Sequence, residues 1–181
     1  MGGGPHPAEP TLARLGYPLH KMSMEARAWS RLRAWDPALK RLNELGLCPL
    51  ECALEVSGQE VRAGSWYGIE PGEYWLTGES REHGFRIGSY SYWEWWTTQL
   101  RAAIPERAWT QWAPFLRVAG RGLDGGWGAG ACAECLELWR RWEPEILNSL
   151  DPETLSNFER LWGEFRTGFE LGSQGGALQI Y

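Results

Sequence analysis

The sequence lacks several features that would assign it to a familiar class of protein. No apolar run is long enough to cross a membrane. The N-terminal stretch Met-Gly-Gly-Gly-Pro-His-Pro has neither the charged nor the apolar segment of a secretory signal. The arginines are scattered, so no basic stripe is present that would neutralise a run of phosphates. We therefore expect a cytoplasmic protein that binds neither membranes nor nucleic acid.

Catalytic and cofactor-binding motifs are missing as well. The sequence contains no Gly-x-Ser-x-Gly elbow, no phosphate loop and no His-Glu-x-x-His. The three histidines, His6, His20 and His83, have no partners at metal-binding or catalytic spacing. Glycines make up half of residues 119–130 and lead towards a helix, but no lysine follows them, and Asp124 would repel a phosphate. We read this stretch as a tight connection and expect no cofactor.

The four cysteines form two closely spaced pairs, Cys48 with Cys52 and Cys132 with Cys135. Four thiolates can hold zinc, and the second pair also has a redox spacing. The first pair is not a tight two-residue knuckle, and no thioredoxin-like pattern surrounds the second. We therefore favour small, reduced core residues and predict that zinc is absent.

Tryptophan is the most unusual feature of the composition. The chain has 181 residues and a net charge of −5, and it contains 13 Trp against 5 Phe and 6 Tyr. This length fits a single domain, which we place at 21–181 after a flexible arm at 1–20. So many indoles must build an aromatic core or line a surface that contacts a partner.

Several stretches carry the signals of helices. Residues 22–35 have apolar side chains at helical spacing. Asp36-Pro37 and Asp151-Pro152 are caps of the type that begins a helix, with Gly46 and Gly172 as the expected ends. Ser91 and Glu94 form a predicted capping box, flanked by Tyr90 and Trp95 as a hydrophobic staple, for a helix that runs to about Ala103.

Three further helices are expected in the second half of the chain. A short piece covers 109–118, and a longer helix that Pro144 bends or ends places one set of residues on one face. The last helix carries a second apolar stripe. The first set is Cys132, Cys135, Leu136, Trp139 and Trp142. The second is Leu155, Phe158, Trp162, Phe165 and Phe169, for which we predict burial.

Short strands are predicted between these helices. Residues 52–88 contain alternating apolar positions, at 54 and 56, 61 and 63, 74–77 and 85–87, separated by turn residues. Residues 177–181 are expected to add a last strand. We thus predict an α+β fold, with a small antiparallel sheet packed against about five helices and a helical C-terminal half.

The densest aromatic cluster lies at residues 90–96. On a helix these side chains cover more than half of the circumference, so at least one must point away from the core. An outward ring would stack on an arginine or anchor a partner, and stacking on a sugar or a base also stays open. We favour core packing over a binding platform.

The segment Phe85-Arg86-Ile87-Gly88-Ser89-Tyr90-Ser91, followed by Trp95, resembles the Arg-x-Gly-Ser-Tyr-Ser signature of an uncharacterised family of small bacterial and phage proteins. The Leu123–Gly126 stretch before Cys132 is similar to the second signature of that family, although the acidic residue expected beside Asp124 is missing. The resemblance covers roughly residues 83–181. It supports the fold and implies no established activity.

Two classes of function follow. The first is a non-enzymatic binding protein for a protein partner, such as an immunity or inhibitor protein or a phage–host interaction factor. The second is a small-ligand protein or an enzyme with a site between the Ser89–Tyr92 turn and the Asp124 loop, which would then be in contact. The candidate binding residues are Arg86, Ser89, Tyr90, Tyr92, Trp93, Asp124 and Trp127.

Overall fold

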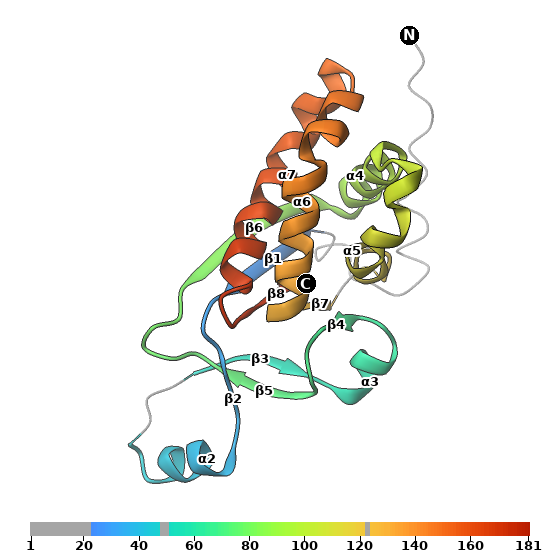
Figure 1. The fold of residues 1–181 in the computed structure, drawn as a ribbon. Helices are drawn as coiled ribbons and strands as arrows, with labels where there is room; N and C mark the ends of the chain where they lie inside the picture. Colours follow the sequence, from blue (N-terminus) through green and yellow to red (C-terminus); the bar gives the residue numbers. More distant parts are fainter. Residues whose placement is uncertain (1–22, 48–50, 122–123) are drawn as a thin grey trace.

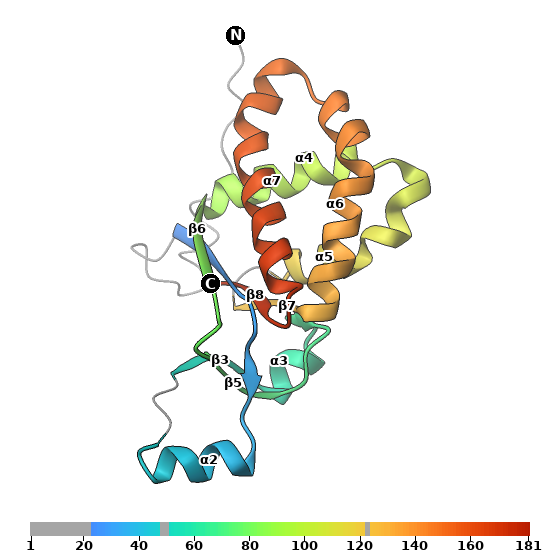
Figure 2. The same cartoon turned by 60° about the vertical axis from the view of Figure 1, so that its left-hand side comes forward.

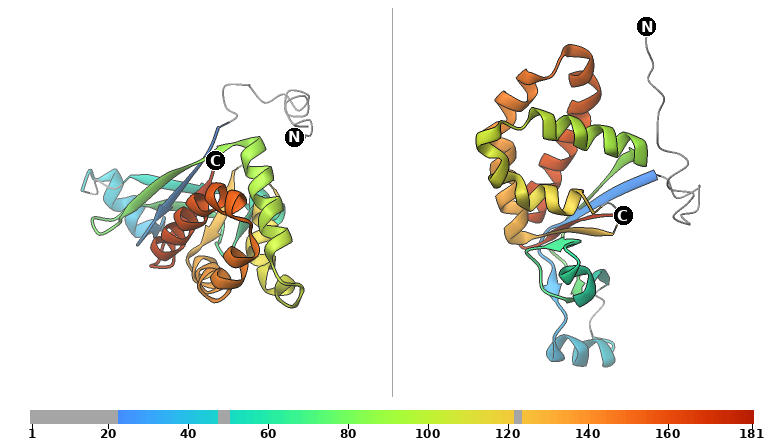
Figure 3. Two further views of the ribbon diagram at one scale, coloured as in Figure 1. Left: turned by 90° about the horizontal axis from the view of Figure 1, so that it is seen from above. Right: turned by 90° about the vertical axis from the view of Figure 1, so that its right-hand side faces the viewer.

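The computed structural model describes residues 23–47, 51–121 and 124–181, and the predicted arm at 1–20 lies outside them. The described chain forms two sheets and six α-helices, which confirms the α+β prediction. The larger sheet has five strands in the order β4–β7–β8–β1–β6, and the longer helices cover one of its faces (Figures 1 and 3). None of the described helices is long and apolar enough to span a membrane.

The five-stranded sheet is antiparallel except for one parallel pair, β4 with β7. Its strands come from distant parts of the chain: β1 (Ser23–Trp29), β4 (Trp66–Tyr67), β6 (Glu82–Ser89), β7 (Gly125–Gly128) and β8 (Ala177–Ile180). The helices that pack on it are α4 (Tyr90–Ala103), the 3-10 helix η2 (Glu106–Trp112), α5 (Ala113–Ala119), α6 (Ala129–Ser149) and α7 (Pro152–Gly172).

The first strand corrects the helix predicted at 22–35. Met24, Ala26 and Ala28 are buried, while Glu25 and Arg27 between them are exposed, so the segment has the two-residue period of a strand. Both periods are present in these few residues. The strand forms because β1 pairs with β6 on one side and with β8 on the other.

Helix α4 begins two residues earlier than predicted. Ser89 is the N-cap, and its Oγ accepts a hydrogen bond from the backbone N–H of Tyr92 at 3.0 Å. The predicted capping box of Ser91 and Glu94 is therefore wrong, since Ser91 already lies within the first turn. The reason is that β6 passes directly into α4, so the last residue of the strand becomes the cap. The predicted end at Ala103 is confirmed.

The glycine-rich segment at 119–130 contains a strand where we predicted a connecting loop. Strand β7 lies between β4 and β8, and all four of its residues are buried. A Cβ atom at Gly125, Gly126 or Gly128 would come within 2.0, 2.0 or 2.1 Å of a backbone carbonyl oxygen of a neighbouring segment. Glycine is therefore required by close backbone packing at these positions.

Helices α6 and α7 lie side by side as a long hairpin (Figure 2). The five residues that we predicted to share one face of α6 are all buried, but the helix continues past Pro144 to Ser149. In α7, four of the five predicted residues are buried and Leu155 is half-buried. The predicted last strand is confirmed as β8, which returns from α7 to the middle of the sheet.

The interior is an aromatic core, as the cluster at 90–96 led us to favour. Nine of the 13 tryptophans are buried. Trp96 stacks on Phe158 with ring centroids 4.8 Å apart, and Trp139 stacks on Trp162 at 4.6 Å. The indole N–H of Trp96 donates to the carbonyl of Phe158, and that of Trp139 to the carbonyl of Trp162. These bonds satisfy the polar edge of each ring inside the core.

A three-stranded sheet in the order β2–β5–β3 lies beside the first. It consists of β2 (Arg33–Ala34), β3 (Cys52–Val56) and β5 (Gly72–Trp75), with helices α2 (Pro37–Glu44) and α3 (Gly58–Arg62). The Asp36 cap of α2 is confirmed, and Gly46 follows it with a positive φ. Helix α3 replaces the strand predicted around Val61 and Ala63, because Ser57 caps it by accepting from the N–H of Glu60.

The cap of α7 makes a pH-dependent contribution to stability. The carboxylate of Asp151 accepts from the backbone N–H and the hydroxyl of Thr154, both at 2.9 Å, and the backbone bond is the main cause that lowers its pKa. Because the folded pKa lies below the unfolded one, this stabilisation is complete above the unfolded pKa and is lost as the pH falls through the folded pKa.

We expect Asp151→Ser, which keeps a capping oxygen without a titrating group, to lose less stability than the wild type between neutral and acidic pH. Urea unfolding midpoints over a pH series provide the measurement. Asp36 is unchanged in both proteins and serves as an internal control. Parallel pH profiles for the two proteins would contradict a titrating cap at Asp151.

Candidate binding site

Two of the candidate binding residues are core residues. Trp93 is 2% exposed and stacks on Trp96, and Trp127 is 0% exposed and stacks on Phe115. The indole N–H of Trp127 donates to the carbonyl of Pro114 at 2.9 Å. Neither ring is available to anchor a partner, since both are enclosed between the sheet and the helices. Their side chains stabilise the fold.

The other residues of the first signature lie where β6 passes into α4. The side chain of Arg86 is exposed, on the face of the sheet away from the helices. Ser89 caps α4, and Tyr90 is its half-buried first residue. Arg160 of α7 donates to the carbonyl oxygens of Arg86 and Ile87, both at 2.9 Å, beside the irregularity in the pairing of β6 with β1. The guanidinium of Arg160 thus satisfies two backbone carbonyl oxygens of the edge strand β6.

Asp124 lies apart from Arg86, Ser89 and Tyr92. It immediately precedes β7, is exposed, and has a φ of 61°. The sheet order places β8 and β1 between β7 and β6, which separates the strands by roughly 14 Å at the usual strand spacing. Within the described ranges, Asp124 forms no hydrogen bond or ion pair with Arg86, Ser89 or Tyr92. The predicted polar contact of Asp124 with these three side chains is therefore not observed.

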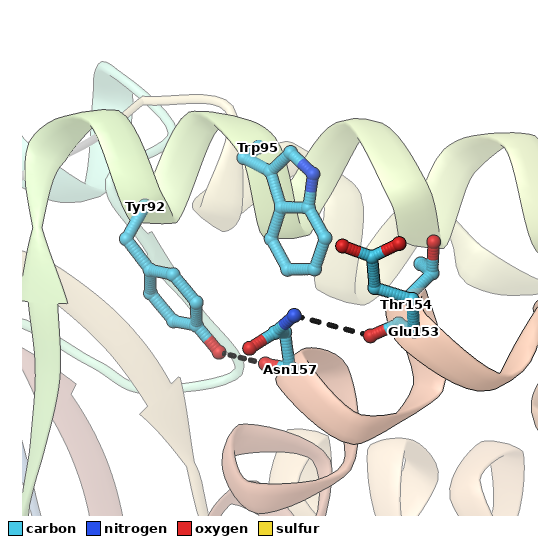
Figure 4. Close-up of a pocket in the computed structure, with 5 residues that line it drawn as sticks. All are labelled: Tyr92, Trp95, Glu153, Thr154 and Asn157. Atoms are coloured by element: carbon cyan, nitrogen blue, oxygen red, sulfur yellow. Dashed lines mark hydrogen bonds between the residues drawn. The ribbon is translucent and has the colours of Figure 1, made fainter. Parts of the chain in front are cut away.

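Tyr92 instead faces the start of α7. It lines a pocket of about 300 Å³ together with Trp95 from α4 and three residues from the first turns of α7, Glu153, Thr154 and Asn157. Figure 4 shows the ring of Trp95 above the side chain of Asn157, with Tyr92 on one side and Glu153 and Thr154 on the other. The pocket thus combines two aromatic rings with a carboxylate, a hydroxyl and an amide.

The aromatic wall of the pocket is held in place by its own contacts. The hydroxyl of Tyr92 donates to the carbonyl of Asn157 at 2.6 Å, and its ring stacks on Trp95 with centroids 5.6 Å apart. The guanidinium of Arg160 lies 5.9 Å from the centroid of the Tyr92 ring. Burial raises the pKa of the Tyr92 phenol, although Arg160 opposes this shift. The phenol is therefore neutral at physiological pH and acts as a hydrogen-bond donor.

The floor of the pocket presents hydrogen-bond acceptors. The amide nitrogen of Asn157 donates to the carbonyl of Glu153 at 3.1 Å, which leaves the amide oxygen free to accept. The hydroxyl of Thr154 donates to Asp151 at 2.9 Å. Among the described residues, no hydrogen bond or ion pair engages the carboxylate of Glu153. The pocket therefore offers an unpaired negative charge beside two aromatic rings.

A second pocket of about 280 Å³ lies on another side of α4. Tyr90, Trp93, Arg101 and Gly120 are among the residues that line it. Its surface is mostly polar, and the guanidinium of Arg101 would lie 3.3 Å from a Cβ placed on Gly120. Trp93 is almost fully enclosed, so the half-buried ring of Tyr90 stands here where the first pocket has the two rings of Tyr92 and Trp95.

The cysteines lie in separate parts of the fold. Cys132 and Cys135 are fully buried in the main core, and this burial raises the pKa of both thiols. Cys52 is exposed on β3, close to Glu55 and Glu73, with all three ligand atoms within 4.8 Å of one another. Cys48 lies outside the described residues. Cys52 thus has carboxylates as its neighbours, whereas Cys132 and Cys135 are packed among apolar side chains, as we favoured.

Sequence reasoning missed most of the first pocket. It identified Tyr92 and predicted that one aromatic side chain of the 90–96 cluster would point outwards, which fits the half-buried Trp95. Glu153, Thr154 and Asn157 carry no motif, and they come from a helix about 60 residues further along the chain.

Known proteins provide no guide to this site, and the family resemblance at 83–181 stays a prediction. Comparisons of the chain with protein-family models, with curated proteins and with solved structures found no match.

Proposed function

We propose that this protein is a non-enzymatic binding protein for a protein partner, and that the pocket between α4 and α7 forms part of the binding surface. Immunity and inhibitor proteins and phage–host interaction factors are the classes that we have in mind. The observation that carries the proposal is the half-buried pair of Tyr92 and Trp95 beside the unpaired carboxylate of Glu153.

Tyrosine and tryptophan are the side chains that most often dominate the energy of protein interfaces. Here the two rings are already ordered, because Tyr92 is bonded to the backbone of α7 and stacked on Trp95. A partner that packs against them would lose little side-chain entropy on binding. Most of the other Trp side chains are buried in the core, so a partly accessible one such as Trp95 points more strongly to a binding surface.

The lining of the pocket supports binding rather than catalysis. Acid–base catalysis commonly uses two groups with separated pKa values, or a nucleophile with an adjacent base. Glu153 is the one carboxylate that lines this pocket among the described residues, and Tyr92 is neutral. At about 300 Å³ the pocket is at the lower limit for small-molecule sites, so a single side chain of a partner fits it better than a cofactor.

The test is affinity capture from a lysate of the source organism, followed by binding measurements with the purified partner. We expect Trp95→Ala to lower the affinity for the partner by about 30-fold or more, which is the effect of losing an interface hot spot. Trp109→Ala serves as the matched control, because Trp109 is 41% exposed and lies outside the pocket. Unchanged melting temperatures would show that both variants are folded. A partner that binds Trp95→Ala as tightly as the wild type would overturn the proposal.

A further inference from the structure

We infer that the pocket between α4 and α7 accepts a cationic side chain of the partner, an arginine in preference to a lysine. This inference rests on the proposed function and adds the chemistry of the group that is recognised. It follows from three features of the pocket: the hydrogen-bonding character of its floor, the aromatic rings of its wall, and the way in which the start of α7 is capped.

The floor offers more hydrogen-bond acceptors than donors. The carboxylate of Glu153 and the amide oxygen of Asn157 only accept hydrogen bonds, and one of the two N–H groups of the Asn157 amide already donates to the carbonyl of Glu153. In Figure 4 the six-membered ring of Trp95 points towards Asn157, while its nitrogen lies on the far side. Groups that carry several donors, such as guanidinium and ammonium, therefore match this floor.

The wall favours a planar cation. Cations are attracted to the faces of tryptophan and tyrosine rings, and guanidinium also stacks on them. The chain itself shows this preference, because the guanidinium of Arg160 lies against Tyr92. Two nitrogens of Arg160 are held by the carbonyls of Arg86 and Ile87, so this side chain stays at the edge of the sheet, and Trp95 and Glu153 are left for a second cation.

The start of α7 does not form an anion site. A free helix N-terminus attracts anions through its backbone N–H groups. Here Asp151 occupies the N–H of Thr154, and the carboxylate of Glu153 stands in the same turn. Two carboxylates at the first turn repel a phosphate or a carboxylate ligand, and the net charge of −5 adds to this preference.

The experiment uses NMR detection of the tryptophan indole N–H groups in the full-length protein. The Trp95 signal is assigned by its loss in Trp95→Phe. The probes are Nα-acetyl-arginine amide, Nα-acetyl-lysine amide and Nα-acetyl-citrulline amide, the last being a neutral analogue of arginine. We expect a saturable shift of the Trp95 signal with the arginine probe, a weaker response to lysine and none to citrulline, with affinities that fall as salt is added.

The role of the carboxylate is tested with Glu153→Gln. This variant should bind the arginine probe with about 10-fold lower affinity, because a charge-assisted hydrogen bond is lost. Glu159→Gln is the matched control: it removes an exposed charge from the same helix outside the pocket and should change affinity by less than about 2-fold. Equal responses to arginine and citrulline, or an unchanged affinity in Glu153→Gln, would overturn the inference. If the arginine probe does not bind while Trp95→Ala still abolishes partner binding, the proposed function stands and only the inference of a cationic side chain is wrong.

Discussion

Gly126→Ala is expected to destabilise the protein by about 3 kcal/mol or more, at or above the usual range for overpacking. The new methyl carbon would lie 2.0 Å from the carbonyl oxygen of Leu178 and 2.8 Å from the ring of Trp66. The carbonyl of Leu178 belongs to β8, which pairs with β7, so it cannot withdraw without breaking the sheet, and the ring of Trp66 is itself buried. Chemical denaturation measures the loss, provided that the variant folds.

Gly163→Ala is the matched control for this prediction. Gly163 lies within α7, and a Cβ atom there meets nothing within 4 Å. Alanine is favoured over glycine in a helix by roughly 0.5–1 kcal/mol, so this change should stabilise the protein. A Gly126→Ala protein as stable as the wild type would contradict the close packing of β7 against β8. Failure of Gly126→Ala to fold, with Gly163→Ala folded, would agree with it.

Trp162→Ala is expected to reduce the free energy of unfolding by about 3–5 kcal/mol. Trp162 is 2% exposed, stacks on Trp139 at 4.6 Å, and contacts Phe158 at a centroid distance of 6.0 Å. Its indole N–H donates to the carboxylate of Glu143 at 2.7 Å, and Arg166 pairs with the same carboxylate. The substitution therefore opens a cavity in the aromatic core and leaves Glu143 with one partner fewer.

The measurement is equilibrium unfolding in guanidinium chloride. The unfolding midpoints of wild type and variant are compared, provided that the free energy of unfolding falls with denaturant concentration at the same slope in both. Trp109→Ala is the control, since this 41% exposed ring should contribute no more than about 0.5 kcal/mol. A loss below about 1.5 kcal/mol for Trp162→Ala would show that the α6–α7 contact is less closely packed than the ring distances indicate.

The candidate site was only partly predictable. Tyr92 stood out because too many aromatic residues follow one another at 90–96 for a single helix face to bury. Trp93 was named as a binding residue on the same grounds, and Trp127 was named as part of the Asp124 loop, but both are in the core. Which ring of such a cluster remains accessible depends on where the neighbouring helices pack. That arrangement also brings Glu153 and Asn157 to Tyr92, and it places two strands between β6 and β7, the strand that Asp124 precedes.

The sequence by itself determined the features that depend on a few adjacent residues. The caps at Asp36 and Asp151 follow from a side chain that bonds to its own helix, and the stripe on α7 follows from the helical repeat. Tertiary structure decided the features that need a distant partner. Residues 23–29 carry both helical and strand periods, and the glycines of β7 carry no pattern of their own, so pairing with β6, β8 and β4 makes both segments strands. A strand has no internal hydrogen bonds, and its backbone is satisfied only by segments that lie far away in the chain.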